Sequence, residues 1–159
     1  MADYTKSIRK FVGHTPIILN TATGIVMDHG QLLLQERAGG GWCLPEGYLE
    51  YGESYSEACK RELLEDTGLN VEVVRPLGMF DKYFMDYSNG DKLQNIGMLF
   101  LVKPMSGHLL KKRTNETWDL KYFDINHTPD LVFKQNQDML DLVRDLVRQD
   151  KLMQHDHLN

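Results

Sequence analysis

Three acidic side chains, Glu62, Glu65 and Asp66, follow one another closely in a segment whose pattern predicts a helix. At about 100° per residue, they fall within an arc of roughly 100° on the helix surface. Like charges at this spacing destabilise a helix, so the cluster calls for a compensating charge. Mg²⁺ takes carboxylate and phosphate oxygens as ligands, and three converging carboxylates are therefore a candidate hard-cation site. The alternative is a solvated helix face that is rich in acids.

The helix that carries these acids has predictable ends. Ser54 and Glu57 have the spacing of a capping box, and Gly68 is the residue type that commonly follows a helix C-terminus. Arg61 lies four residues before Glu65 and partly neutralises it. An adjoining arc of the helix is predicted to face the core: Tyr55, Cys59 and Leu63.

The residues around the acids form a longer pattern. It consists of Gly47, Glu53, the run Arg61-Glu62-Leu63, the pair Glu65-Asp66 and the pair Gly68-Leu69. This pattern resembles the signature box of the Nudix (MutT-like) hydrolases, G-x5-E-x7-R-E-U-x-E-E-x-G-U, where U is a bulky aliphatic residue. Every fixed position matches except Asp66, where the family usually has Glu. A Trp-x-Leu-Pro sequence at 42–45 precedes the box and adds to the resemblance.

The resemblance implies both a fold and an activity. The fold is a single α/β domain over 1–159, a Nudix-type α/β/α sandwich with a mixed β-sheet, a catalytic helix after the box loop and a C-terminal helix. The activity is hydrolysis of a diphosphate bond in a nucleoside diphosphate linked to another group, X, with Mg²⁺ or Mn²⁺ as cofactor. The alternative within the same family is a non-catalytic nucleotide-sensing domain, which would need a damaged box.

The resemblance also implies roles for individual residues. Glu62, Glu65 and Asp66 are expected to bind the metal, and one of them, or a further acid, to orient or deprotonate the attacking water. Glu53 and Arg61 are expected to pair and to hold the loop against the helix. Aspartate at 66 keeps the charge but reaches less far, so a shifted metal geometry is expected.

Three further positions near the box bear on the site. Gly47 is expected to permit a tight approach of the loop to the helix. Glu46 stands where the family commonly has Gly, and its backbone carbonyl is expected to bind a metal. Its side chain either faces solvent or adds negative charge, and a positive φ would strain it. Glu116, in TNETWDL, lies where many family members carry another catalytic or metal-binding acid, and Asp119 is a poorer candidate. Both could also be plain surface acids.

Three residues are candidates for binding substrate. Arg37, before the glycine loop, could bind phosphate through two parallel hydrogen bonds, or could simply end a strand at the surface. Trp42 could line the nucleotide pocket or pack under the box loop. Tyr87 lies in the aromatic segment 83–91, where rings could stack on a base or pack the sheet edge.

The remaining elements follow from residue patterns. Strands are predicted at 15–29, 31–37, 70–84, 92–103, 108–112 and 118–125, and helices at 54–67 and 134–150, with a helix or ordered arm at 3–11. Turns are predicted at 29–30 and 89–90, and a non-helical loop over 38–47. This order of elements indicates an α/β sandwich with a mixed sheet.

Composition narrows the class of protein. The 159 residues are 42% hydrophobic and 26% charged, with a net charge of −5. A membrane span and a stable nucleic-acid partner are not expected, and neither is a signal peptide, so we expect a cytoplasmic protein. The resemblance to the Nudix hydrolases implies a nucleotide-derived small molecule as substrate. A homodimer is plausible on family likeness. Cys43 and Cys59 are expected to be reduced thiols, and the histidines of the tail at 155–159 to be solvated.

Overall fold

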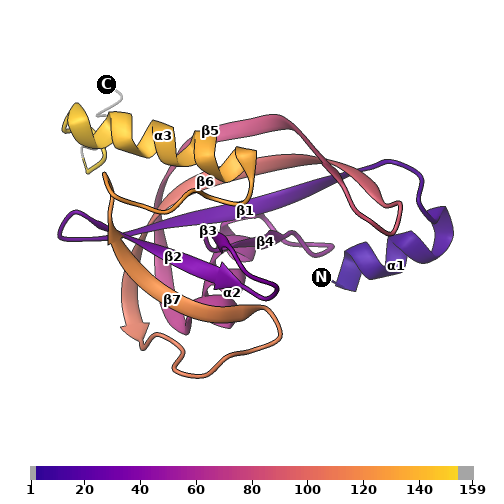
Figure 1. The fold of residues 1–159 in the computed structure, drawn as a ribbon, viewed down its shortest axis with the longest axis horizontal. Coiled ribbons are helices and arrows are strands. Elements are labelled where there is room, and N and C mark those ends of the chain that lie inside the picture. The colour runs from indigo at the N-terminus through magenta and orange to yellow at the C-terminus, as the bar shows by residue number, and fades with distance from the viewer. Residues whose placement is uncertain (1–2, 154–159) are drawn as a thin grey trace.

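A computed structural model describes residues 3–153 of the chain (Figure 1). The helices are α1 (Asp3–Val12), α2 (Tyr55–Thr67) and α3 (Lys134–Arg148). The strands are β1 (Ile17–Asp28), β2 (Gln31–Arg37), β3 (Trp42–Cys43), β4 (Glu46–Tyr48), β5 (Leu69–Asp86), β6 (Lys92–Gly107) and β7 (Thr117–Asp124). The prediction for the tail histidines lies outside the described residues.

The sheet is mixed and is organised around β1. That strand runs parallel to β6 from the pair Ile17–Leu93 to the pair Val26–Val102, and β6 pairs antiparallel with the long, bulged β5. At its other end β1 forms a hairpin with β2, which pairs antiparallel with β7 and β3, while β4 pairs antiparallel with β1. A short strand carrying Glu46 is thereby fixed beside the middle of β1.

Two hydrophobic cores lie on opposite faces of this sheet (Figure 1). One core contains the buried face of α3 and the other contains the buried face of α2. The residues that the helices contribute are Met139, Leu140 and Val143 from α3, and Ala58, Cys59 and Leu63 from α2. Burial of these side chains supplies most of the driving force that holds the layers together. The expected α/β/α sandwich with a mixed sheet is confirmed.

Helix α2 has the ends that its sequence predicts. The Ser54 side chain accepts a hydrogen bond from the Glu57 amide, and the Glu57 carboxylate accepts one from the Ser54 amide, which completes the capping box. Gly68 ends the helix in the left-handed conformation, with φ of 83°. These caps fix which residues of α2 face the sheet and the site.

Two predictions of local structure were wrong. Residues 108–112 form no strand, because β6 itself continues to Gly107 and the chain then leaves the sheet, with the amide of Leu110 bound to the carbonyl of Thr67. The segment 38–47 is not entirely loop, because β3 and β4 add to the sheet there. Both cysteines are buried and free, as expected. Among the described residues, no helix is long and apolar enough to cross a membrane.

Candidate active site

Two elements far apart in the sequence bring three carboxylates together. Glu62 and Asp66 lie one turn apart on α2, and Glu116 comes from the loop before β7. One carboxylate oxygen from each of the three lies within 4.8 Å of the others. Thr117, next to Glu116, ties the two elements together, because its hydroxyl donates to the carbonyl of Asp66 at 2.9 Å. We call Glu62, Asp66 and Glu116 the acid trio.

The loop that carries Glu116 is held by its own hydrogen bonds. The Thr114 hydroxyl accepts from the amides of Glu116 and Thr117 at 3.2 and 2.9 Å, and the Glu116 carbonyl accepts from the Ala38 amide at 2.9 Å. The Gln35 side-chain Nε2 donates to the Thr117 hydroxyl at 2.8 Å. These contacts place an exposed acid at a fixed point beside two buried acids.

The electrostatics of the trio favour a bound cation. Burial, together with the neighbouring carboxylates of Glu62 and Glu116, raises the pKa of Asp66 to about 8. Burial likewise raises the pKa of Glu62, although Arg61 opposes the shift. A hard divalent cation takes such oxygen donors and removes their mutual repulsion. The donor set of the trio therefore fits Mg²⁺ or Mn²⁺.

Glu65 lies apart from the acid trio. Its side chain is 58% exposed and its carboxylate lies 3.6 Å from an Arg61 nitrogen, as the i,i+4 spacing predicts. Glu65 lines the same cavity as the trio. The structure thus gathers Glu62, Asp66 and Glu116, whereas the sequence pattern grouped Glu65 with the two helix acids.

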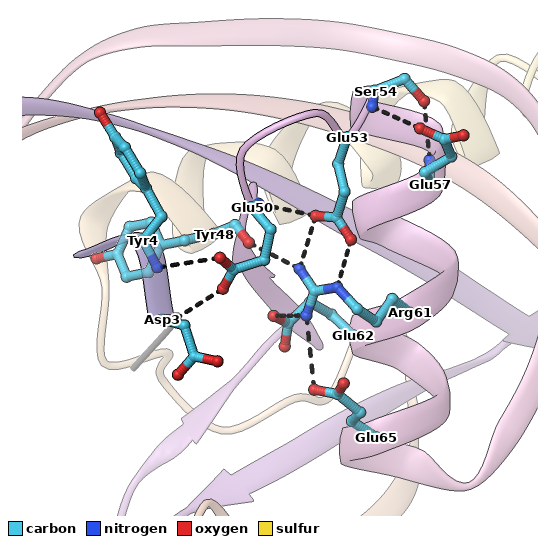
Figure 2. Close-up of polar contacts among 10 residues, drawn as sticks. All are labelled: Asp3, Tyr4, Tyr48, Glu50, Glu53, Ser54, Glu57, Arg61, Glu62 and Glu65. Carbon is cyan, nitrogen blue, oxygen red and sulfur yellow. Dashed lines mark hydrogen bonds and ion pairs between the residues drawn. The ribbon is translucent and has the colours of Figure 1, made fainter. Parts of the chain in front are cut away.

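A brace around Arg61 orients Glu62 (Figure 2). The Nε and Nη2 atoms of Arg61 donate to the two carboxylate oxygens of Glu53 at 2.5 and 2.8 Å. Arg61 Nη2 also donates to the Tyr48 carbonyl at 3.0 Å. Its Nη1 donates to Glu62 Oε1 at 2.5 Å. The paired guanidinium lowers the pKa of Glu53. The expected Glu53–Arg61 pair is present, and it fixes one oxygen of Glu62.

The acid trio opens into a cavity of about 870 Å³. Arg37 lines it, with its guanidinium 4.8 Å from the centre of the Phe133 ring. Further lining side chains come from β4 and the β5–β6 hairpin: Tyr48, Tyr83, Phe84, Met85 and Tyr87. A cavity of this size with both charge signs and aromatic walls suits a polar small molecule.

Trp42 is not among the residues that line the cavity. Its ring packs edge to face on Phe123, with the ring centres 4.9 Å apart. The contact with Phe123 of β7 favours a packing role for Trp42 over a role in the cavity wall, although the ring packs against the core beside α3 and not under the box loop.

Glu46 points inward, so the alternative of a solvated side chain was wrong. Its Oε2 accepts hydrogen bonds from the Thr23 hydroxyl at 2.9 Å and from Asn136 Nδ2 at 3.0 Å. Asn136 in turn accepts from the Leu44 amide at 2.9 Å. The φ angle of Glu46 is not positive, so its backbone is free of the strain that a positive φ would bring. Nothing in the local sequence pattern points to Asn136, which lies 90 residues further along the chain.

Gly47 makes the close approach that was expected of it. A Cβ built on Gly47 would lie 1.9 Å from Cδ of Glu62, far inside contact distance. Only a residue without a side chain lets β4 lie against the acid-bearing face of α2.

Fold and site together define an α/β sandwich with an acidic centre beside its second helix, and known proteins share this arrangement of elements. A model of the NUDIX domain matches residues 19–146. An ADP-ribose pyrophosphatase from Methanocaldococcus jannaschii is 30% identical over 128 residues, which cover 76% of this chain and 70% of that protein.

Solved structures show the same fold. The crystal structure of a UDP-X diphosphatase aligns with a TM-score of 0.70 at 23% identity, over 93% of this chain and 71% of that one. A MutT NUDIX hydrolase from Burkholderia pseudomallei aligns with a TM-score of 0.68 at 22% identity, over 79% of this chain and 98% of that one. The chain belongs to the Nudix hydrolase family.

Proposed function

We propose that this chain is a divalent-metal-dependent pyrophosphohydrolase that cleaves a diphosphate bond in a nucleoside diphosphate linked to another group, X. The observation that carries the proposal is the acid trio of Glu62, Asp66 and Glu116, with oxygens within 4.8 Å of one another, in the wall of the large cavity. The names of the archaeal relative and of the UDP-X structure describe proteins that act on such diphosphates, which supports the same substrate class here.

The acid trio would hold Mg²⁺ or Mn²⁺. When bound, the metal would neutralise charge on the phosphoryl oxygens and lower the pKa of a coordinated water. Glu65 and the backbone carbonyl of Glu46 are proposed as further ligands beside the trio. Glu46 and Glu65 are both among the residues that line the cavity of the trio.

The other side chains of the cavity would bind and orient the substrate. Arg37 lies on the Phe133 ring, which restricts its guanidinium before a phosphate arrives. A planar guanidinium can give a phosphate two parallel hydrogen bonds. Tyr87 and Tyr48 offer ring faces for the nucleoside or for X. Arg61 holds one oxygen of Glu62 through the reaction, and an acid of the site takes the proton from the attacking water.

The test is a substrate panel assayed with Mg²⁺ and again with EDTA, with released phosphate measured after coupling to a phosphatase. Suitable substrates are nucleoside triphosphates, ADP-ribose, nucleotide sugars, dinucleoside polyphosphates and NADH. We expect turnover of at least one diphosphate, complete loss of turnover with EDTA, and loss of at least about a hundredfold in kcat for Glu62→Gln.

The matched control is Glu72→Gln. Glu72 is an exposed β5 acid whose carboxylate lies 3.8 Å from the Lys60 nitrogen, outside the cavity lining. It should turn over like the wild type. If the folded wild-type protein binds nucleotides but releases no phosphate from any substrate, the proposal is wrong and a sensing role takes its place.

A further inference from the structure

Helix α1 lies outside the part of the chain that matches the family. The helix spans Asp3–Val12, whereas the match to the NUDIX domain begins at residue 19. Even so, Asp3 lines the cavity, and Thr5, which is 2% exposed, packs the helix onto the domain. In Figure 1, α1 lies at the end of the molecule where the β5–β6 hairpin turns. Its first end contacts Glu50 in the cavity wall, and its last turn contacts the β5–β6 hairpin, which carries aromatic side chains of another wall.

The first end of α1 is bound to the box loop. The two oxygens of the Glu50 carboxylate accept from the amides of Asp3 at 2.7 Å and Tyr4 at 3.0 Å (Figure 2). The first amides of a helix have no partner within the helix, and the helix dipole favours a negative charge there. Glu50 therefore acts as a cap for α1 that is supplied from 46 residues further along the chain.

Glu50 also connects α1 to the acid trio. Its own amide donates to Glu53 Oε2 at 2.8 Å, and Glu53 receives the two hydrogen bonds of Arg61 described above. Arg61 then binds Glu62. Figure 2 shows these side chains in sequence from the N-terminus of α1 to α2. A shift of Glu50 would thus move the groups that orient one member of the trio.

The second end of α1 is bound to the aromatic hairpin. Arg9 donates to the carbonyls of Gly13 at 2.9 Å, Thr15 at 2.7 Å and Lys92 at 2.8 Å. Its Nε lies 3.8 Å from the Asp91 carboxylate, which also binds His14 Nδ1 at 2.7 Å. The same hairpin carries the lining side chains Tyr83, Phe84, Met85 and Tyr87.

We propose that α1 is a clamp that sets two walls of the substrate cavity relative to each other. Glu50 is a positioning residue for the box helix and its metal ligands, and Arg9 is a positioning residue for the aromatic hairpin that contacts the nucleoside or X. The proposal rests on the proposed hydrolase function. Because the two ends hold different walls, they should affect different kinetic constants.

The experiment compares Glu50→Gln and Arg9→Ala in the full chain, with a substrate found in the panel and with Mn²⁺ as the activating ion. Glu50→Gln should lower kcat and raise the Mn²⁺ concentration for half-activation by about threefold, less than the 10–100-fold that loss of a direct partner of a metal ligand costs, because Glu50 acts through Glu53 and Arg61. KM should stay near the wild-type value. Arg9→Ala should raise KM by about fivefold, the equivalent of about one hydrogen bond, and leave kcat and the Mn²⁺ midpoint unchanged.

The matched controls are Lys10→Ala, on the exposed face of α1, and Glu72→Gln, on β5. Both should leave all three constants unchanged. Wild-type kcat and Mn²⁺ midpoint in folded Glu50→Gln would overturn the clamp, and so would a KM effect that appears equally in both variants.

Hydrogen exchange separates this proposal from the proposed function. Glu50→Gln should speed exchange in residues 3–12 and 47–54, and Arg9→Ala should speed exchange in residues 83–92, whether or not the protein turns over substrate. Unchanged exchange in all three segments would overturn the clamp even if the enzyme is active. If the wild type shows no turnover while these exchange changes appear, the proposed function fails and the clamp stands.

Discussion

Replacing Gly47 with alanine should disturb the position of Glu62 in the acid trio while the protein remains folded. The added methyl would lie 1.9 Å from Cδ of Glu62 and 2.3 Å from its Cγ. Carbon atoms pack at about 3.5–4.0 Å, so Glu62 or β4 must move by about 1.5–2 Å. Glu62 cannot yield freely, because Arg61 Nη1 binds its Oε1 at 2.5 Å. Overpacking of this kind costs about 1–3 kcal/mol of the free energy of unfolding.

The effect on activity should exceed the effect on stability. A misplacement of about 1 Å in a catalytic group can cost about a hundredfold in rate, so we expect Gly47→Ala to lose at least about a hundredfold in kcat while remaining folded. The assays are steady-state kinetics on the substrate found in the panel and urea unfolding of the same sample.

The control for Gly47→Ala is Gly78→Ala on β5. A Cβ at Gly78 meets its nearest atoms, in Leu142 and Phe80, at 3.4 Å, which is ordinary contact. It should keep wild-type kcat. A folded Gly47→Ala variant with wild-type kcat would refute the reasoning, since it would show that Glu62 can be displaced without loss of catalysis.

Three more outcomes follow from the polar contacts of the site. Asn136→Leu should destabilise the protein by about 2–4 kcal/mol in urea unfolding, because it leaves the Glu46 carboxylate and a buried backbone amide without their donor and acceptor. Arg61→Lys should lose at least about tenfold in kcat, because an ammonium cannot replace the fork of bonds to Glu53; kcat equal to wild type would contradict the brace. Because the pKa of Asp66 is raised to about 8, above its unfolded value, the folded metal-free protein binds the extra proton, and its free energy of unfolding should fall as pH rises from about 4 to about 8. Mg²⁺ should then raise Tm more near pH 8.5 than near pH 6, and an equal shift at both would contradict the assignment.

The sequence pattern correctly predicted helix ends and turns, because neighbouring residues determine these features. Ser54 and Gly68 end α2 where their side-chain and backbone preferences require, and the turn at His29 and Gly30 forms with positive φ at both residues. The pairing of Arg61 with Glu53 was expected from the resemblance of the box to the Nudix signature, and the structure contains it.

Contacts between distant segments could not be predicted in the same way. The inward position of Glu46 depends on Thr23 of β1 and Asn136 of α3, and the pairing of β4 with β1 brings all three together. The segment 108–112 forms no strand because β6 ends at Gly107 and the chain then leaves the sheet, with the Leu110 amide bound to the carbonyl of Thr67 at the end of α2.

The acid trio illustrates the same limit. Glu116 joins Glu62 and Asp66 through the contact of Thr117 with the carbonyl of Asp66, which no helical periodicity encodes. The contacts of Glu50 with the start of α1 are likewise long-range, because Asp3 and Tyr4 precede Glu50 in the chain by 47 and 46 positions. The residue types alone do not predict these contacts.

The most direct test of the metal site is anomalous diffraction from crystals of the full chain grown with Mn²⁺ and a non-hydrolysable nucleoside diphosphate analogue. The account predicts an anomalous peak within bonding distance of carboxylate oxygens from Glu62, Asp66 and Glu116, with the analogue's phosphate oxygens completing the coordination. A peak elsewhere in the cavity, or a bound analogue with no manganese beside the trio, would contradict the central claim that these three acids hold the catalytic metal.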